Sequence, residues 1–150
     1  IQDSGEQMRA MQECLRVLRP HGILFVTFVS RFAQAVSIIN RAPETIGEWK
    51  AIMQEVIETG VNDRDPGFTD SFFFDPQAID PFMRRFPVEK LAIAGVEGLF
   101  AQSEEKLKQL GREVMDQWIE FSFAHSTHPS FVGSCQHILY VGRKTGDTDK

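Results

Sequence analysis

The amino-acid sequence predicts an α/β domain with three strands. Two observations support this class. A helical pattern over residues 5–18 ends at a Pro-x-Gly turn and leads directly into an apolar strand at residues 23–29. Further along the chain, residues 88–143 show a strand, a helix and a second strand in that order. Alternation between the helical and the extended period is typical of a sheet covered by helices.

The first helix is expected to begin near Gly5, because Ser4 and Gln7 form a Ser-x-x-Gln capping box. Its apolar residues recur at spacings of three and four and so share one face: Met8, Met11, Leu15 and Leu18. Pro20 and Gly22 end the helix. Residues 23–29 then form an apolar run, as expected of a strand buried on both faces of a parallel sheet.

Residues 32–71 are predicted to be an insertion. It holds a short helix at 32–40, a second helix at 43–59 ended by Gly60, and a loop at 62–70. The stripe that contains Trp49 is read as core. Residues 72–74 form an extended segment, after which Asp75 caps a helix with Pro76 at its first position. The apolar side of that helix comprises Ile79, Phe82, Met83 and Phe86.

The C-terminal part is predicted to contain two strands and a long helix between them. The first strand spans 88–96, with Leu91, Ile93 and Val96 in the core. Ser103 caps a helix that reaches about Ala124 and carries a core stripe of Leu107, Leu110, Val114, Trp118 and Phe121. Residues 125–134 are a loop, 137–143 the last strand, and 145–150 a frayed tail.

Composition narrows the function classes. The 42% hydrophobic and 25% charged residues are those of a soluble globular protein, and the 13 Phe suggest apolar packing or an apolar pocket. The net charge of −5 without a block of like charge gives no footprint for nucleic acid or an anionic membrane. No apolar run approaches the roughly 20 residues of a membrane span, and the polar N-terminus is no signal peptide. Two distant cysteines are expected in a reduced, cytoplasmic protein.

Residues 13–22 read Glu-x-x-Arg-Val-Leu-Arg-Pro-x-Gly. This stretch resembles the fifth-strand region of class I S-adenosylmethionine-dependent methyltransferases, in which Glu-x-x-Arg-Val-Leu-Lys/Arg-Pro-Gly-Gly precedes the strand, with His21 in place of the first glycine. Residues 72–79, 88–99 and 137–144 are similar to the end of the same fold. The resemblance implies a Rossmann-like sheet whose last two strands pair antiparallel at one edge. Residues 1–150 would be a single partial domain, with 32–71 as a substrate-side insertion.

The cofactor loop of that family is absent from the sequence. The family cradles S-adenosyl-L-methionine in an acidic-x-Gly-x-Gly-x-Gly loop after its first strand, and the glycines at 95, 98 and 142 do not form a Gly-x-Gly loop between a strand and a helix. No cofactor-binding residue is therefore predicted. S-adenosyl-L-methionine is expected in the parent enzyme and is not expected to bind this chain alone.

Candidate substrate-binding residues lie where strands end, since ligands of open α/β sheets bind outside the carboxyl ends of strands. Arg31 could clamp an anion and Phe32 could wall an apolar pocket, next to Ser30. Phe74 and Glu97 complete the set. Each also has a structural interpretation: a solvated arginine, core phenylalanines, and a turn glutamate.

Histidine and cysteine residues near the C-terminus raise the question of a metal site. His125, His128, Cys135 and His137 lie within a short stretch. We interpret them as structural, because Cys135 and His137 would point the same way without obvious further metal ligands, and predict no metal site. No catalytic residue is predicted either. Methyl transfer needs little acid–base help, because the sulfonium leaving group departs neutral and positioning dominates.

The sequence thus predicts the C-terminal, substrate-side fragment of a methyltransferase for a small molecule, a transferase inactive without the rest of the fold. The alternative is a non-catalytic interaction domain that retains half of the fold, and a third reading is the tail of a nicotinamide-dependent oxidoreductase. Self-association is expected through the exposed edge of strand 23–29 or through helix 5–18. Neither nucleic acid nor a membrane is an expected partner.

Overall fold

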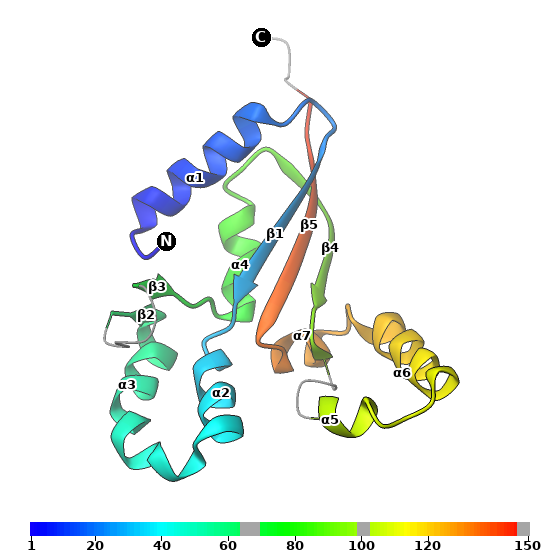
Figure 1. The fold of residues 1–150 in the computed structure, drawn as a ribbon. Coiled ribbons are helices and arrows are strands. Elements are labelled where there is room, and N and C mark those ends of the chain that lie inside the picture. The colour runs from blue at the N-terminus through cyan, green and yellow to red at the C-terminus, as the bar shows by residue number, and fades with distance from the viewer. Residues whose placement is uncertain (64–69, 99–102, 147–150) are drawn as a thin grey trace.

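A computed structural model describes residues 1–63, 70–98 and 103–146. The fold is mixed α/β (Figure 1). Its elements, in chain order, are α1 (Ser4–Val17), β1 (Ile23–Val29), α2 (Ala33–Arg41), the 3-10 helix η1 (Pro43–Thr45), α3 (Ile46–Thr59), β2 (Val61–Asn62), β3 (Ser71–Phe72), α4 (Pro76–Met83), β4 (Val88–Gly95), α5 (Glu104–Leu107), α6 (Arg112–His125), α7 (Pro129–Ser134) and β5 (His137–Lys144).

The main sheet has three strands in the order β1-β5-β4, and β5 pairs antiparallel with both neighbours. The predicted antiparallel pairing of the last two strands is confirmed. Because β5 is antiparallel to both, β1 and β4 run in the same direction and their carboxyl ends lie at the same end of the sheet, next to α7 (Figure 1). The residues that follow β1 and β4 therefore lie at this end.

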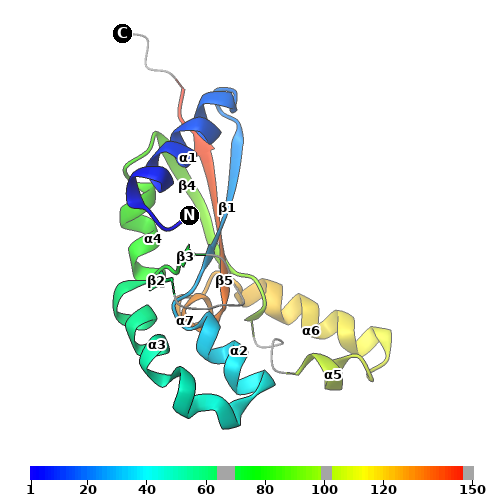
Figure 2. The same cartoon turned by 60° about the vertical axis from the view of Figure 1, so that its left-hand side comes forward.

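Helices α1 and α4 cover one face of the sheet (Figure 2). Met11 and Leu15 of α1 are buried in one cluster with Ile79 and Met83 of α4, which are 0% and 1% exposed. The predicted apolar faces of both helices are therefore confirmed. The last strand also secures α1, since Nζ of Lys144 donates to the carbonyl oxygens of Leu15 and Leu18, both at 2.9 Å.

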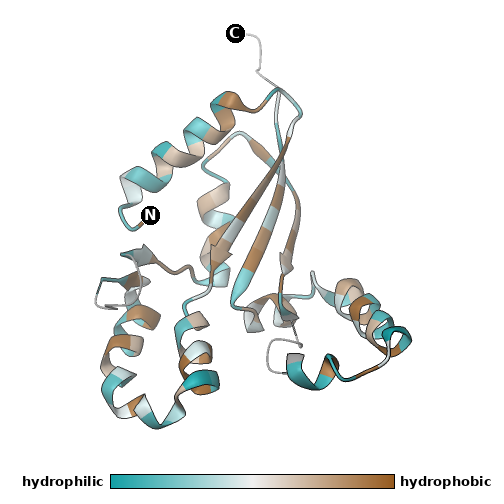
Figure 3. Ribbon diagram, viewed as in Figure 1, coloured by the Kyte–Doolittle hydropathy of each residue, from teal (hydrophilic) through white to brown (hydrophobic). Residues whose placement is uncertain are grey.

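The prediction that residues 23–29 are buried on both faces is wrong. Leu24 and Phe28 are buried under the helices, but Ile23 is 40% and Phe25 66% exposed on the other face. The strand is hydrophobic along its length (Figure 3). Alternate side chains stay exposed because α1 and α4 pack on one side only, and β1 is an edge strand of an antiparallel sheet.

Two further core predictions fail on β4. Leu91 is 41% and Val96 57% exposed. A register shift between Lys90 and Ala92 takes Leu91 out of the alternation, as a bulged residue opposes no partner. Val96 lies just beyond the end of the strand at Gly95.

Local capping signals were good guides to the helix ends. Asp75 accepts a hydrogen bond from the amide of Gln77 at 2.8 Å, and Gly60 ends α3 with a φ of 83°, both as predicted. The cap of α1 is instead Asp3, one residue before the predicted Ser4. Its Oδ1 accepts from the amide of Glu6 at 2.9 Å.

The predicted insertion comprises α2, η1 and α3, followed by the hairpin of β2 and β3. Pro43 begins η1, and the predicted second helix starts at Ile46. Asn62 belongs to β2, whereas residues 64–69 of the predicted loop lie outside the described residues. Residues 147–150 of the predicted tail also lie outside them, and the amide of Thr145 donates to Pro87 at 3.0 Å.

The predicted long helix is two helices, because the chain breaks at Gly111, which caps α6. Both views show α6 extending away from the sheet (Figures 1 and 2). Residues 112–125, all of them described, include none that is buried, and Trp118 and Phe121 are 42% and 47% exposed. Their predicted place in the core is wrong. Among the described helices, none is both long and apolar enough to cross a membrane.

Candidate functional site

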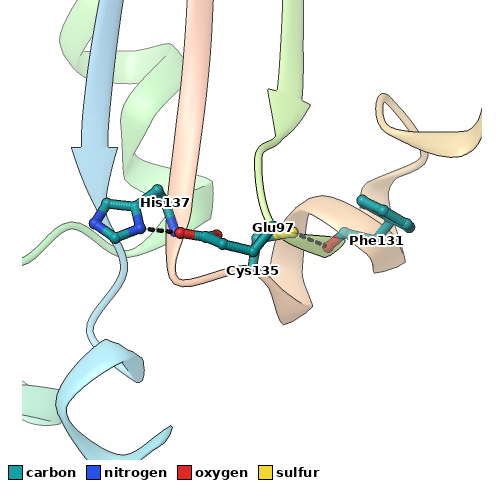
Figure 4. A network of polar contacts seen from close by, with 4 residues as sticks. All are labelled: Glu97, Phe131, Cys135 and His137. Carbon is teal, nitrogen blue, oxygen red and sulfur yellow. Dashed lines mark hydrogen bonds and ion pairs between the residues drawn. The ribbon is translucent and has the colours of Figure 1, made fainter. Parts of the chain in front are cut away.

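The start of β5 lies between the carboxyl ends of β1 and β4 and is hydrogen-bonded to both. The amide of Ser30 donates to Gln136 at 2.7 Å, and the amide of Val96 donates to His137 at 3.0 Å. Residues that follow two different strands are thereby held on either side of His137. Glu97 is the first ionisable residue after β4, and its side chain turns toward β5 (Figure 4).

Glu97 and His137 form a two-point contact (Figure 4). One carboxylate oxygen, Oε1, bonds Nδ1 of the imidazole, and the other, Oε2, accepts from the His137 amide at 3.0 Å. The side chains are 26% exposed for Glu97 and 45% for His137. His137 thus has a carboxylate partner that its position in the sequence did not suggest. Its partner lies 40 residues away in sequence and is brought there by the antiparallel pairing of β4 and β5.

The turn that carries Glu97 is fixed by α7. A Cβ atom at Gly95 would lie 2.2 Å from Sγ of Cys135, and one at Gly98 would lie 2.1 Å from the ring of Phe131. Gly98 also has a φ of +57°, which strains other residues. Both glycines therefore let α7 pack closely against the turn. Residues 125–134 were predicted to be a loop, but Pro129–Ser134 is helical. Nδ1 of His128 caps the start of this helix, since it accepts from the Ser130 amide at 3.2 Å.

Cys135 lies beneath this turn as a neutral thiol. Its Sγ donates to the carbonyl oxygen of Phe131 at 3.2 Å, and the residue is 4% exposed. Burial raises the pKa of the Cys135 thiol, and the negative charge of Glu97 raises it further. A buried thiol of raised pKa is a poor nucleophile.

We expect Cys14 to react with Ellman's reagent and Cys135 to react at least about tenfold more slowly in the folded chain. Cys14 is exposed, whereas Cys135 is buried and its raised pKa lowers its thiolate fraction at neutral pH. Stopped-flow absorbance measurements on the Cys14→Ser and Cys135→Ser variants would assign each kinetic phase of the reaction to one thiol. Equal reaction rates for the two thiols in the native protein would contradict the burial of Cys135. As a control, unfolding in guanidinium should make the two rates equal.

The residues predicted around β1 already have internal partners. Ser30 is fully buried, and its Oγ accepts from the Phe32 amide at 3.3 Å. Nη1 of Arg31 donates to the carbonyl oxygens of Ile57 and Glu58 at 3.0 and 3.1 Å, so it holds the end of α3. Arg31 is therefore not the solvated side chain of the structural interpretation, and Phe32 is not the core residue of that interpretation. Phe32 is 53% exposed and remains available to a ligand.

Phe74 lies apart from Glu97, over the covered face of the sheet. Its ring meets those of Phe28, Phe72 and Phe82 at centroid distances of 4.7, 5.0 and 5.4 Å. This cluster borders a cavity of about 340 Å³ between α1 and the carboxyl end of β1. The structure thus brings Phe74 beside Ser30, Arg31 and Phe32, since Ser30 and Phe74 form a parallel bridge and the Arg31 amide donates to the Phe74 carbonyl oxygen at 3.1 Å. Glu97, which follows β4 on the other side of β5, does not join this group.

A second cavity, of about 360 Å³, lies beside the Glu97 turn. It is walled by Ala94 and Leu139 of the sheet, by Ile119 and Phe123 of α6, and by Phe131 of α7. Its polar lining side chains are the hydroxyls of Ser122 and Ser126. Its volume lies within the range of sites for small molecules.

The described residues show no metal-ligating cluster and no open backbone cradle at the turn from β1 into α2. No group of three His, Cys, Asp or Glu side chains converges among residues 1–63, 70–98 and 103–146. The turn from β1 into α2 is closed by its own bonds, since the amides of Phe32 and Ala33 both donate to Ser30. That turn offers no open backbone cradle for a cofactor.

Comparison with known proteins gives no assignment: the chain matches no protein-family model and has no significant match among curated proteins.

Proposed function

We propose that this chain is the C-terminal, substrate-side portion of a class I S-adenosylmethionine-dependent methyltransferase that acts on a small molecule. The observation that carries the proposal is the sheet: β4 and β5 pair antiparallel at one edge, as the resemblance in residues 13–22, 72–79, 88–99 and 137–144 implies. The cofactor would bind to the remaining part of the fold, because this sequence lacks the acidic-x-Gly-x-Gly-x-Gly loop that holds it in the family.

The β1 side of the second sheet face supports the same proposal. Helices α1 and α4 lie on the first face, whereas α6 and α7 meet the second face only near Ala94 and Leu139, and Ile23 and Phe25 are exposed there to solvent. Apolar sheet faces are normally covered. Further protein on this face, and a strand alongside β1, would complete a doubly covered α/β sheet.

An alternative from another class is an interaction domain without catalysis. The feature that favours it is α6, whose exposed apolar side chains are Val114, Trp118, Ile119, Phe121 and Phe123. Val114, Trp118 and Phe121 share one face at spacings of four and three, and an exposed apolar stripe of this kind marks a contact with another protein. The same helix also walls the 360 Å³ cavity, so it has a role in the enzyme hypothesis as well.

Expression from the complete reading frame tests the proposal. We expect the codons before Ile1 to encode an acidic-x-Gly-x-Gly-x-Gly loop after a strand, and the complete product to bind S-adenosyl-L-methionine by calorimetry. We also expect it to transfer a labelled methyl group to small molecules of a cell extract. The 150-residue chain alone should do neither. A reading frame that opens at Ile1, or a longer product that does not bind the cofactor, would favour the interaction domain.

A further inference from the structure

We propose that a cavity of about 300 Å³ between α1, β3 and α4 binds a small aromatic carboxylate, with its ring against Phe74 and Phe82 and its carboxylate at Arg85. The inference deepens the proposed function and rests on it in one respect, because it names the class of small molecule on which that enzyme acts. The binding site itself is argued from contacts of the described residues.

The walls of this cavity come from separate parts of the chain that the fold brings together (Figure 1). They include Gln7 of α1, Arg31 after β1, Phe72 of β3, and Ala78 and Phe82 of α4. The cavity adjoins the 340 Å³ cavity described above, since Gln7, Phe72 and Phe82 line both. Its volume is at the lower end of the range for small-molecule sites, so it suits a ligand built on a single ring.

Phenylalanine rings form the apolar wall of the cavity. The rings of Phe74 and Phe82 lie 5.4 Å apart between centroids, with 65° between their planes, and Phe72 meets Phe74 at 5.0 Å. All three residues are half-buried and line the cavity, so each keeps some surface that a ligand can cover. A flat aromatic ring packs well in such edge-to-face arrangements.

Arg85 places a positive charge beside this wall. Its guanidinium carbon, Cζ, lies 6.0 Å from the centre of the Phe82 ring, and the residue lines the cavity. Arg85 is exposed, and no acidic side chain of the described residues forms an ion pair with it. Its N–H groups can therefore bind both oxygens of a ligand carboxylate.

Arg31 adds a second positive charge to the lining. Its Nη1 donates to the carbonyl oxygens of Ile57 and Glu58, which are neutral groups, and its Nε is buried with no partner in the described part of the chain. Asp75 is the acidic side chain among the described lining residues, and its Oδ1 already accepts from the Gln77 amide at 2.8 Å. Two guanidinium groups against one carboxylate favour an anion in the cavity.

The lining determines the ligand class. A neutral aromatic molecule would cover the phenylalanine wall but leave the Arg85 guanidinium without an anion. An inorganic anion would pair with the arginine and leave the apolar wall in water. A benzoate-like acid meets both requirements, because its carboxylate is attached directly to the ring and Arg85 lies beside the ring of Phe82.

Fluorine NMR of 4-fluorobenzoate, observed in the presence of the 150-residue chain, tests the charge requirement. We expect this acid to bind more tightly than its neutral analogue 4-fluorobenzamide. Arg85→Gln should weaken binding of the acid about fivefold and leave the amide unchanged. Arg84→Gln is the matched control, because Arg84 is also exposed but does not line the cavity. Equal affinities for acid and amide, or equal effects of the two substitutions, would overturn the proposal.

Filling the cavity tests its position. Ala78 is exposed on α4 and lines the cavity, so Ala78→Leu should weaken binding of both probes about tenfold. Ala124→Leu makes the same change at an exposed position of α6 and should have no effect. Binding unaffected by Ala78→Leu, or a wild-type chain that binds neither probe, would refute the proposal. No cofactor enters these measurements, so their failure is distinct from a failure of the complete reading frame to bind S-adenosyl-L-methionine.

Discussion

Replacing Ile79 by alanine is expected to lower the free energy of unfolding by about 2–5 kcal/mol. Ile79 is fully buried in α4, within the cluster that joins both helices to the sheet through Leu24 and Ile138. Truncation removes apolar contacts and leaves a cavity that the surrounding helices and strands cannot fully close. Urea denaturation followed by circular dichroism measures the change.

Ile39→Ala is the matched control for this experiment. Ile39 lies in α2 and is 64% exposed, so the same chemical change should alter stability by no more than about 0.5 kcal/mol. A similar loss for the two variants would mean that α4 does not pack against the sheet as described. A large loss for Ile79→Ala alone would establish that α1, α4 and the three strands form one core.

Elements whose signals are local were predictable from the sequence. The apolar spacing of Met11 and Leu15 and the Asp75-Pro76 start each needed only neighbouring residues, and the structure bears them out. The bounds of β1 were also predicted, because the turn at Pro20 and Gly22 marks where it begins. What sequence could not supply was the burial of its two faces, which depends on where α1 and α4 pack.

The C-terminal errors have a common cause. The stripe through Trp118 has a helical spacing whether or not anything covers it, and the break at Gly111 together with the direction of α6 leaves it exposed. Burial of a helix face is a tertiary property that periodicity alone does not determine. The same holds for Leu91, which a bulge in β4 moved out of the expected alternation.

The sequence predicted a functional role for only one member of the Glu97–His137 pair. Glu97 was predicted as a site residue, whereas His137 was interpreted only as a structural residue. The available signal was the expected antiparallel pairing of the last two strands, which sets the residue after one strand opposite the first residue of the other. Arg31 and Ser30 illustrate the opposite case, because position at a strand end suggested ligand binding while their partners are internal.

The chain is expected to self-associate through β1, and Phe25→Lys should weaken the dimer about tenfold or more. The last residues of this edge are occupied, since the Phe74 amide donates to Val29 at 2.7 Å. From Ile23 to Phe28 the edge has no further strand beside it among the described residues. The other expected surface, helix 5–18, already buries Met11 and Leu15 within the chain.

Sedimentation velocity over a range of concentrations measures this effect. Phe123→Lys is the control, because Phe123 is 81% exposed on α6 and the substitution makes the same change from aromatic to charged away from the edge. We expect Phe123→Lys to associate like the wild type. If it weakens association instead and Phe25→Lys does not, the contact lies on α6, which favours the interaction domain. If only Phe25→Lys weakens self-association, the contact is at the unpaired edge of β1. The methyltransferase proposal places a further strand at this edge. A wild-type chain that stays monomeric at high concentration would contradict the prediction.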